Sequence, residues 1–172
     1  MKSKRQEIIG YVILKFIHSG YSNMDVDMIA NDLAMNPEQL AQYYPDFETL
    51  LFDVLSVITT AYTRKVFYGM HIENKRLTRV EHQAFYEFIS HRLYVFFTSD
   101  VGKAFICIYQ QFEFDARFER LLTAIKTEWT EMLRIVFESV GVKYDAYDAF
   151  NYFFNLACKT HKPQLQAYRT IH

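Results

Sequence analysis

Residues 25–46 of the chain read DVDMIANDLAMNPEQLAQYYPD and contain two helix starts separated by a short turn. Asp25 is a typical N-cap and precedes an apolar stripe, which predicts a helix of about two turns. Asn36 is followed by proline and, three residues after the cap, by glutamine, which is the pattern of a capping box with proline at the first helical position. Ala34 and Met35 separate the two predicted helices, so the segment predicts a helix-turn-helix.

The sequence on both sides of this segment has the apolar spacing of amphipathic helices. Residues 3–19 carry apolar side chains on one helical stripe, which predicts a helix before the segment. Asp46 is a predicted N-cap, and the long helix after it is expected to reach about residue 70. Asp100 and Asp145 are predicted to cap two of the further helices, which cover residues 79–98, 100–112, 115–140 and 146–161. The predicted fold class is therefore all-α, with a three-helix unit followed by a larger helical domain.

Composition limits the class of protein. The chain has 172 residues, of which 51% are hydrophobic and 17% aromatic, and its formal net charge is −1. This is enough for one sizeable core and excludes a disordered or collagen-like chain. The two cysteines, Cys107 and Cys158, cannot form a disulfide framework by themselves, which favours a reducing cytoplasm. The N-terminus lacks a signal-peptide cleavage site and no run of about 18 apolar residues occurs, so no membrane segment is predicted.

The sequence has no motif that predicts catalysis. It lacks a glycine-rich phosphate loop, a nucleophile elbow and a catalytic carboxylate pair, so neither an enzyme nor a cofactor is expected. Cys158 and His161 lie one helical turn apart and could supply two metal ligands, but no third ligand follows at a suitable spacing. His82 and His91 are predicted on opposite sides of one helix and cannot chelate a metal together. No metal site is predicted.

A series of residues at the start of the chain keeps a fixed order and spacing. It consists of Ile8-Ile9, Phe16, Gly20-Tyr21, Val26, Ile29-Ala30, Met35-Asn36, Leu40, Tyr43-Tyr44-Pro45, Glu48 and Leu50. In this series the first 52 residues resemble the DNA-binding unit of the tetracycline-repressor (TetR) family of bacterial transcription regulators. The resemblance implies a helix-turn-helix DNA-binding domain over residues 1–46 and a helical ligand-binding and dimerisation domain over residues 47–172. The second domain matches by layout alone.

The resemblance also implies a function and a DNA-binding surface. The chain is expected to be a cytoplasmic transcription regulator that responds to a ligand and binds a two-fold operator DNA as a homodimer. It is expected to act as a repressor. The residues expected at the DNA are Lys2, Lys4, Arg5, Asn36, Gln39, Gln42 and Tyr43. Asparagine and glutamine can pair with adenine edges, and tyrosine can hold a phosphate. The alternative interpretation of the same residues is a solvated helix face and a frayed, solubilising terminus.

Several departures from the family favour a different interpretation. Ala34 replaces the usual glycine of the turn, which is tolerable if this residue stays in the right-handed region. Pro37, Ala41 and Phe47 replace a basic residue, an aromatic residue and a lysine that contact the DNA backbone in the family. Residues 1–50 contain four basic and seven acidic side chains, a net charge of −3, whereas a DNA reader is usually basic. The alternative is a degenerate TetR-like protein that binds an effector or a protein partner without DNA.

The larger domain is expected to bind a small effector and to form the dimer. Its aromatic residues are mostly core, but a few are expected to line a cavity for an apolar or aromatic effector: Phe85, Phe105, Tyr109 and Trp129. The last helix is apolar on two sides, so one side is expected to need a partner. The expected dimer residues are Trp129, Met132, Val136, Tyr147, Phe150 and Phe154. Effector binding is expected to move the long helix over residues 46–70 and change the spacing of the two DNA-reading helices.

Overall fold

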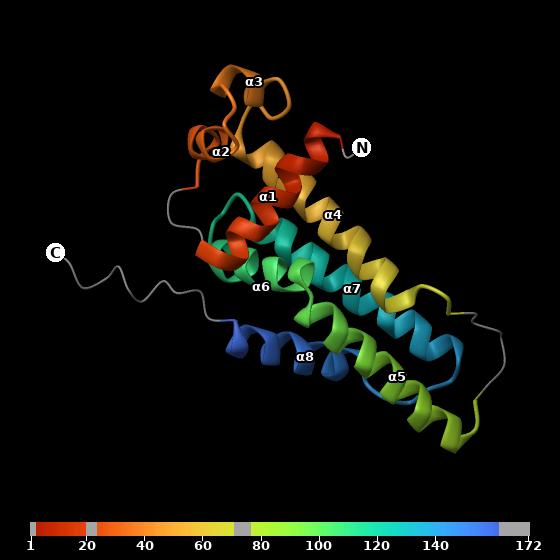
Figure 1. Cartoon of the computed structure of the whole chain (residues 1–172). Coiled ribbons are helices and arrows are strands. Elements are labelled where there is room, and N and C mark those ends of the chain that lie inside the picture. The colour runs from red at the N-terminus through yellow and green to blue at the C-terminus, as the bar shows by residue number, and fades with distance from the viewer. Residues whose placement is uncertain (1–2, 20–23, 71–76, 162–172) are drawn as a thin grey trace.

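The computed structural model describes residues 3–19, 24–70 and 77–161. Helices account for 79% of these residues and none of them forms a strand, so the predicted all-α fold class is confirmed. The described helices are α1 (Lys4–Ser19), α2 (Val26–Asp32), α3 (Pro37–Ala41), α4 (Phe47–Phe67), α5 (Arg79–Thr98), α6 (Asp100–Phe112), α7 (Glu119–Ser139) and α8 (Ala146–Thr160) (Figure 1). Within the same residues, no helix combines the length and the hydropathy that a membrane span requires.

The two helices of the quoted segment begin where the sequence predicts. The Asp25 carboxylate accepts a hydrogen bond from the backbone N–H of Met28 at 2.7 Å and caps α2. Asn36 caps α3, because its side chain accepts from the N–H of Glu38 at 3.0 Å while the Gln39 side chain accepts from the Asn36 N–H at 3.2 Å. The predicted capping box is therefore confirmed, and it fixes the first turn of a helix of only five residues.

The turn between α2 and α3 differs from the expectation for Ala34. This residue has φ = +50° and lies in the left-handed region, not the right-handed one. Its N–H donates to the Asn31 carbonyl at 3.1 Å, and the N–H of Met35 donates to the Ala30 carbonyl at 2.9 Å. These two bonds form a Schellman motif, in which glycine usually occupies the position of Ala34. The Cβ of Ala34 is therefore strained, and the hydrogen bonds of the motif hold it there.

Helix α4 connects the two ends of the molecule. It begins beside α2 and α3, with Asp46 as its cap, and runs along α7 toward the opposite end (Figure 1). At the centre, the Tyr62 ring of α4 stacks on the Trp129 indole of α7 with centroids 4.1 Å apart, and the Tyr62 hydroxyl donates to the Trp129 carbonyl at 3.2 Å. Both side chains are fully buried. This pair fixes the register of the two longest helices.

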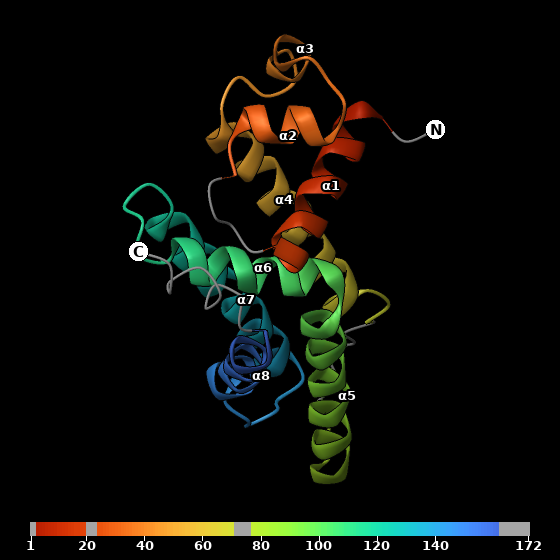
Figure 2. The same cartoon turned by 60° about the vertical axis from the view of Figure 1, so that its left-hand side comes forward.

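The three N-terminal helices share one hydrophobic core with the rest of the described chain. Helix α1 lies across α6 (Figure 2), where the rings of Phe16 and Phe112 meet edge to face at 6.5 Å. Phe47, at the start of α4, lies 6.3 Å from the same Phe112 ring. Helix α6 therefore contacts both helices that flank α2 and α3, and a shift of α6 can reach that pair through packed side chains.

Two helix starts differ from the sequence prediction. Ser99 is the N-cap of α6 and Asp100 is its first helical residue. Helix α7 begins at Glu119, because Asp115 instead accepts from the backbone N–H of Arg117 at 3.0 Å and closes a turn before the helix. The predicted cap of α8 is confirmed: the Asp145 carboxylate accepts from the N–H groups of the next turn.

Candidate functional site

The candidate DNA-reading surface lies on α3 and the turn after it, at one end of the molecule (Figure 2). Asn36, Gln39 and Gln42 are exposed, while Tyr43 is half-buried. The side-chain oxygens of Asn36 and Gln39 are already acceptors in the capping box, so these amides are held against their own helix. Gln42 is therefore the amide of the predicted set that is exposed and outside the capping box. A contact from Asn36 or Gln39 to a base would compete with the cap.

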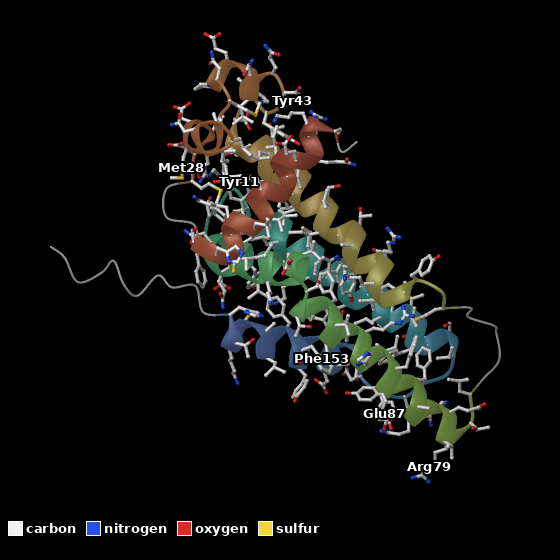
Figure 3. All side chains as sticks on the ribbon, viewed as in Figure 1. Tyr11, Met28, Tyr43, Arg79, Glu87 and Phe153 are labelled. Carbon is white, nitrogen blue, oxygen red and sulfur yellow. The ribbon has the colours of Figure 1, made fainter. Side chains whose placement is uncertain are left out.

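The predicted basic cluster is held by partners within the same unit. Lys4 forms an ion pair with Glu7 at 3.0 Å. Arg5 donates to the Tyr43 carbonyl at 3.2 Å, and its guanidinium lies 5.3 Å from the centroid of the Tyr44 ring; Figure 3 shows Tyr43 close to the start of α1. Lys2 lies outside the described residues. Lys4 thus pairs within α1, and Arg5 connects α1 to the residues after α3. These contacts orient the surface, but they leave less positive charge available to bind phosphate.

A third cation of the unit, Lys15, is also paired. Its ammonium lies 2.8 Å from the carboxylate of Asp32 at the end of α2, and that carboxylate accepts a second hydrogen bond from the Tyr11 hydroxyl. The hydrogen bond from Lys15, followed by the one from Tyr11, holds the pKa of Asp32 below its usual value. This cluster connects α1 to α2, so Lys15 fixes the placement of α2 and is not an isolated positive charge.

Several acidic groups of this unit have structural roles. Asp46 accepts from the backbone N–H of Thr49 at 2.7 Å, and this bond lowers the pKa of the carboxyl group. The buried Tyr44 donates to Asp53 at 3.0 Å, and burial, followed by this contact, raises the pKa of Tyr44 to about 12. Negative charge near α3 is therefore part of the folded unit, because Asp46 caps α4 and Asp53 accepts the hydrogen bond of Tyr44.

The predicted effector residues pack against other aromatic rings. Phe105 and Trp129 are fully buried with ring centroids 4.5 Å apart, and Tyr109 lies 6.3 Å from Phe105. Phe85 is separate from them and packs against Phe137 at 6.1 Å. Three surface grooves of the described residues, one between α5, α6 and α8, one at the end of α4 and one between α4 and α7, are lined by other side chains. Phe105 and Trp129 are core residues, whereas Phe85 and Tyr109 are partly buried and pack against the core. That these rings line a cavity for an effector stays a prediction.

The predicted dimer residues divide into core and surface groups. Trp129, Phe150 and Phe154 are at most 3% exposed within a single chain, so they are core residues and do not belong to a surface interface. Met132 and Val136 line a surface groove of about 290 Å³ together with Phe67, Met70 and Ile135. Tyr147 is 44% exposed and donates to Glu131 at 2.6 Å. The apolar surface available on α7 thus centres on Ile135, which is 58% exposed and was not among the predicted residues.

A second groove, formed by α5, α6 and α8, was not predicted from the sequence. Its volume is about 310 Å³, and its residues come from Tyr94 to His161 along the chain. Because three helices contribute to it, no local pattern marks it. The periodicity of α8 indicated two apolar sides, but not which neighbour each side meets.

The described residues contain no group of three histidine, cysteine or acidic side chains that could hold a metal ion. Cys158 is half-buried, and burial raises the pKa of its thiol to about 11, which disfavours the thiolate that binds metals. Burial also lowers the pKa of His161, followed in effect by the charge of Lys103.

Comparisons of the chain with protein-family models, curated proteins and solved structures gave no match.

Proposed function

We propose that the protein is a homodimeric helix-turn-helix regulator of the TetR type that binds two-fold DNA through α3. The observation that carries the proposal is the capped pair α2 and α3, joined by a four-residue turn and presented at one end of the molecule. Gln42 is exposed on this surface, and a glutamine amide can pair with the N6 and N7 atoms of adenine. The Schellman motif and the capping box hold α3 rigidly for such a contact.

The regulatory part of the proposal rests on packing between α6 and the N-terminal helices. Phe112 of α6 contacts Phe16 of α1 and Phe47 of α4. These two helices flank α2 and α3 in the chain, so a ligand that favours another position of α6 would also favour another position of α3. In a dimer, this movement would change the distance between the two α3 helices and thereby the affinity for a two-fold site.

The homodimer is proposed to form through the exposed apolar surface of α7 and the end of α4. Ile135 is the most exposed residue of the groove that Phe67, Met70, Met132 and Val136 complete. Replacing Ile135 by Glu is expected to give a monomer in analytical ultracentrifugation, because each dimer would bury two carboxylates in an apolar contact. The matched control is Val80→Glu, since Val80 is 81% exposed on α5. This surface would be excluded if the I135E variant still formed a dimer, or if the V80E variant were also a monomer.

The test of DNA binding is selection from a library of random duplexes at low salt. The proposal predicts enrichment of a two-fold sequence that the wild-type protein binds as a dimer. Gln42→Ala is expected to lower affinity for the selected duplex about tenfold, the value of one good bidentate base contact. Asn151→Ala, which removes an exposed amide from α8, is the matched control and is expected to leave affinity unchanged. Equal affinity of both variants would exclude α3 as the reading surface.

A second candidate function is a regulator that responds to an effector or a protein partner without contacting DNA. The net charge of −3 over residues 1–50 favours it, as do the ion pairs of Lys4 and Lys15. In this case the selection would enrich no sequence, while dimer formation would persist. The selection therefore separates the two functions without requiring the identity of an effector.

A further inference from the structure

The groove between α5, α6 and α8 combines an apolar wall with a cationic end. Its apolar wall includes Tyr94 and Phe97 of α5 together with Phe153 and Leu156 of α8. Phe153 is labelled in Figure 3, where α8 approaches α5. Tyr94 is 50% exposed and Leu156 is 38% exposed, although both belong to a concave surface. The volume of about 310 Å³ is at the lower end of the range for small-molecule sites, about 300–1,000 Å³.

The groove contains a lysine but no acidic group. Lys103 of α6 and His161 at the end of α8 both line it, and its nine lining residues, all in the described part of the chain, include no carboxylate. Lys103 forms no ion pair with any described residue, in contrast to the paired Lys4 and Lys15. Burial, followed by the charge of Lys103, lowers the pKa of His161.

The two threonine hydroxyls of the groove are committed to their own helices. Thr98 donates to the Tyr94 carbonyl at 2.8 Å, and Thr160 donates to the Leu156 carbonyl at 3.1 Å. Their protons are therefore not available to a ligand, and Lys103 is the unpaired positive charge of this surface. An uncompensated ammonium beside an apolar wall fits a ligand with the opposite charge and a hydrocarbon body.

We propose that this groove binds a small amphipathic carboxylate, with its hydrocarbon part against Phe97, Phe153 and Leu156 and its carboxylate at Lys103. The site differs from the four aromatic residues that the sequence suggested for an effector. Its occupation does not require that α3 bind DNA, and it is measured without DNA, so failure here and failure of the proposed function are distinguishable.

The test compares three ligands with the same chain length: decanoate, decan-1-ol and decylamine, each below the concentration at which it aggregates or separates from solution. In isothermal titration calorimetry the full-length protein is expected to bind decanoate at least fivefold more tightly than decanol, and decylamine least tightly, since only the anion can pair with Lys103. Binding of decanol equal to that of decanoate, or tighter binding of decylamine, would overturn the proposal.

Two pairs of variants locate the ligand. Lys103→Gln is expected to weaken decanoate binding about fivefold, while Lys159→Gln removes the same charge from an exposed position outside the groove and should have no effect. Leu156→Asp places a carboxylate in the apolar wall and should abolish binding, whereas Tyr152→Asp, one turn earlier on the same helix, exposed and outside the groove, should preserve it. Equal effects within either pair would refute this location. Thermal denaturation without ligand confirms that all four variants are folded.

Discussion

Two helices of this protein end in the same hydrogen-bonded motif with different residues at its left-handed position. Ala34 follows α2 with φ = +50°, and Gly141 follows α7 with φ = +74°. In both places the N–H of the next residue returns to the helix, from Met35 to the Ala30 carbonyl and from Val142 to the Phe137 carbonyl, each at 2.9 Å. Replacing Ala34 by Gly is therefore expected to stabilise the protein, and replacing Gly141 by Ala is expected to destabilise it.

The magnitude follows from two opposing terms. A left-handed residue with a Cβ costs about 1–2 kcal/mol, and glycine at Ala34 removes this strain. Glycine also gives the unfolded chain more freedom, which costs about 0.5–1 kcal/mol. The expected net gain in the free energy of unfolding for A34G is about 0.5–1 kcal/mol, or a rise in Tm of about 2 °C in a chain of this length. G141A should lower stability by a similar amount.

Urea denaturation followed by circular dichroism measures both variants, with Ala124→Gly as the control. Ala124 is exposed in the middle of α7, where glycine is expected to cost about 1 kcal/mol. The reasoning requires opposite signs for the same substitution at positions 34 and 124. A loss of stability in A34G comparable to that in A124G would show that the turn does not strain Ala34, and the account of this turn would be refuted.

Three further predictions concern the larger helical part. Gly102→Ala should lower the free energy of unfolding by about 1–3 kcal/mol. The reason is that an added Cβ would overlap the Phe96 carbonyl oxygen and lie 2.8 Å from the Phe97 Cα. Unchanged stability in thermal denaturation would contradict this prediction. Burial raises the pKa of Cys158 to about 11, so this thiol should react slowly with iodoacetamide at pH 7.5 and faster as pH rises toward 11. Mass spectrometry measures the extent of labelling. Rapid labelling at pH 7.5 would show that burial does not suppress the thiolate. Burial lowers the pKa of the His161 imidazole from 6.5 in the folded protein. As pH falls below 6.5, this imidazole is therefore protonated more readily in the unfolded chain, and the free energy of unfolding is expected to decrease. Its NMR titration midpoint should rise in Lys103→Gln, and a fall would contradict the assigned influence of Lys103.

Local patterns predicted the helix starts well because a cap depends on residues that are neighbours in the chain. Asp25, Asn36, Asp46 and Asp145 all accept the backbone hydrogen bonds that their positions suggested. The exception is Asp100, because Ser99 is the N-cap there, and the Ser99 hydroxyl donates to the Phe96 carbonyl at 2.6 Å and makes no capping bond to the first turn of α6. The left-handed Ala34 was not predicted, since alanine has no intrinsic preference for that region and only the paired hydrogen bonds of the turn impose it.

Roles that depend on distant residues could not be predicted from one sequence. The pattern of α8 gave it two apolar sides, but only the packed structure shows that Phe150 and Phe154 lie in the core, that Leu156 lines the groove with α5 and α6, and that Tyr152 is exposed. The pairing of Lys15 with Asp32 joins two different helices, so residue counts gave the net charge of the unit without showing which cations are already neutralised.

The salt dependence of duplex affinity most directly tests the central proposal, which is sequence-selective DNA binding by a surface with few cations available to phosphate. Arg5 and Lys15 are engaged within the unit, so each protomer has few cations to neutralise phosphates. With about two per protomer, the slope of log affinity against log salt for the dimer should be no steeper than about −4. The account predicts this shallow slope together with at least tenfold preference for the selected two-fold duplex over random duplex in fluorescence anisotropy. Equal affinity for both duplexes, or no binding at low salt, would contradict it.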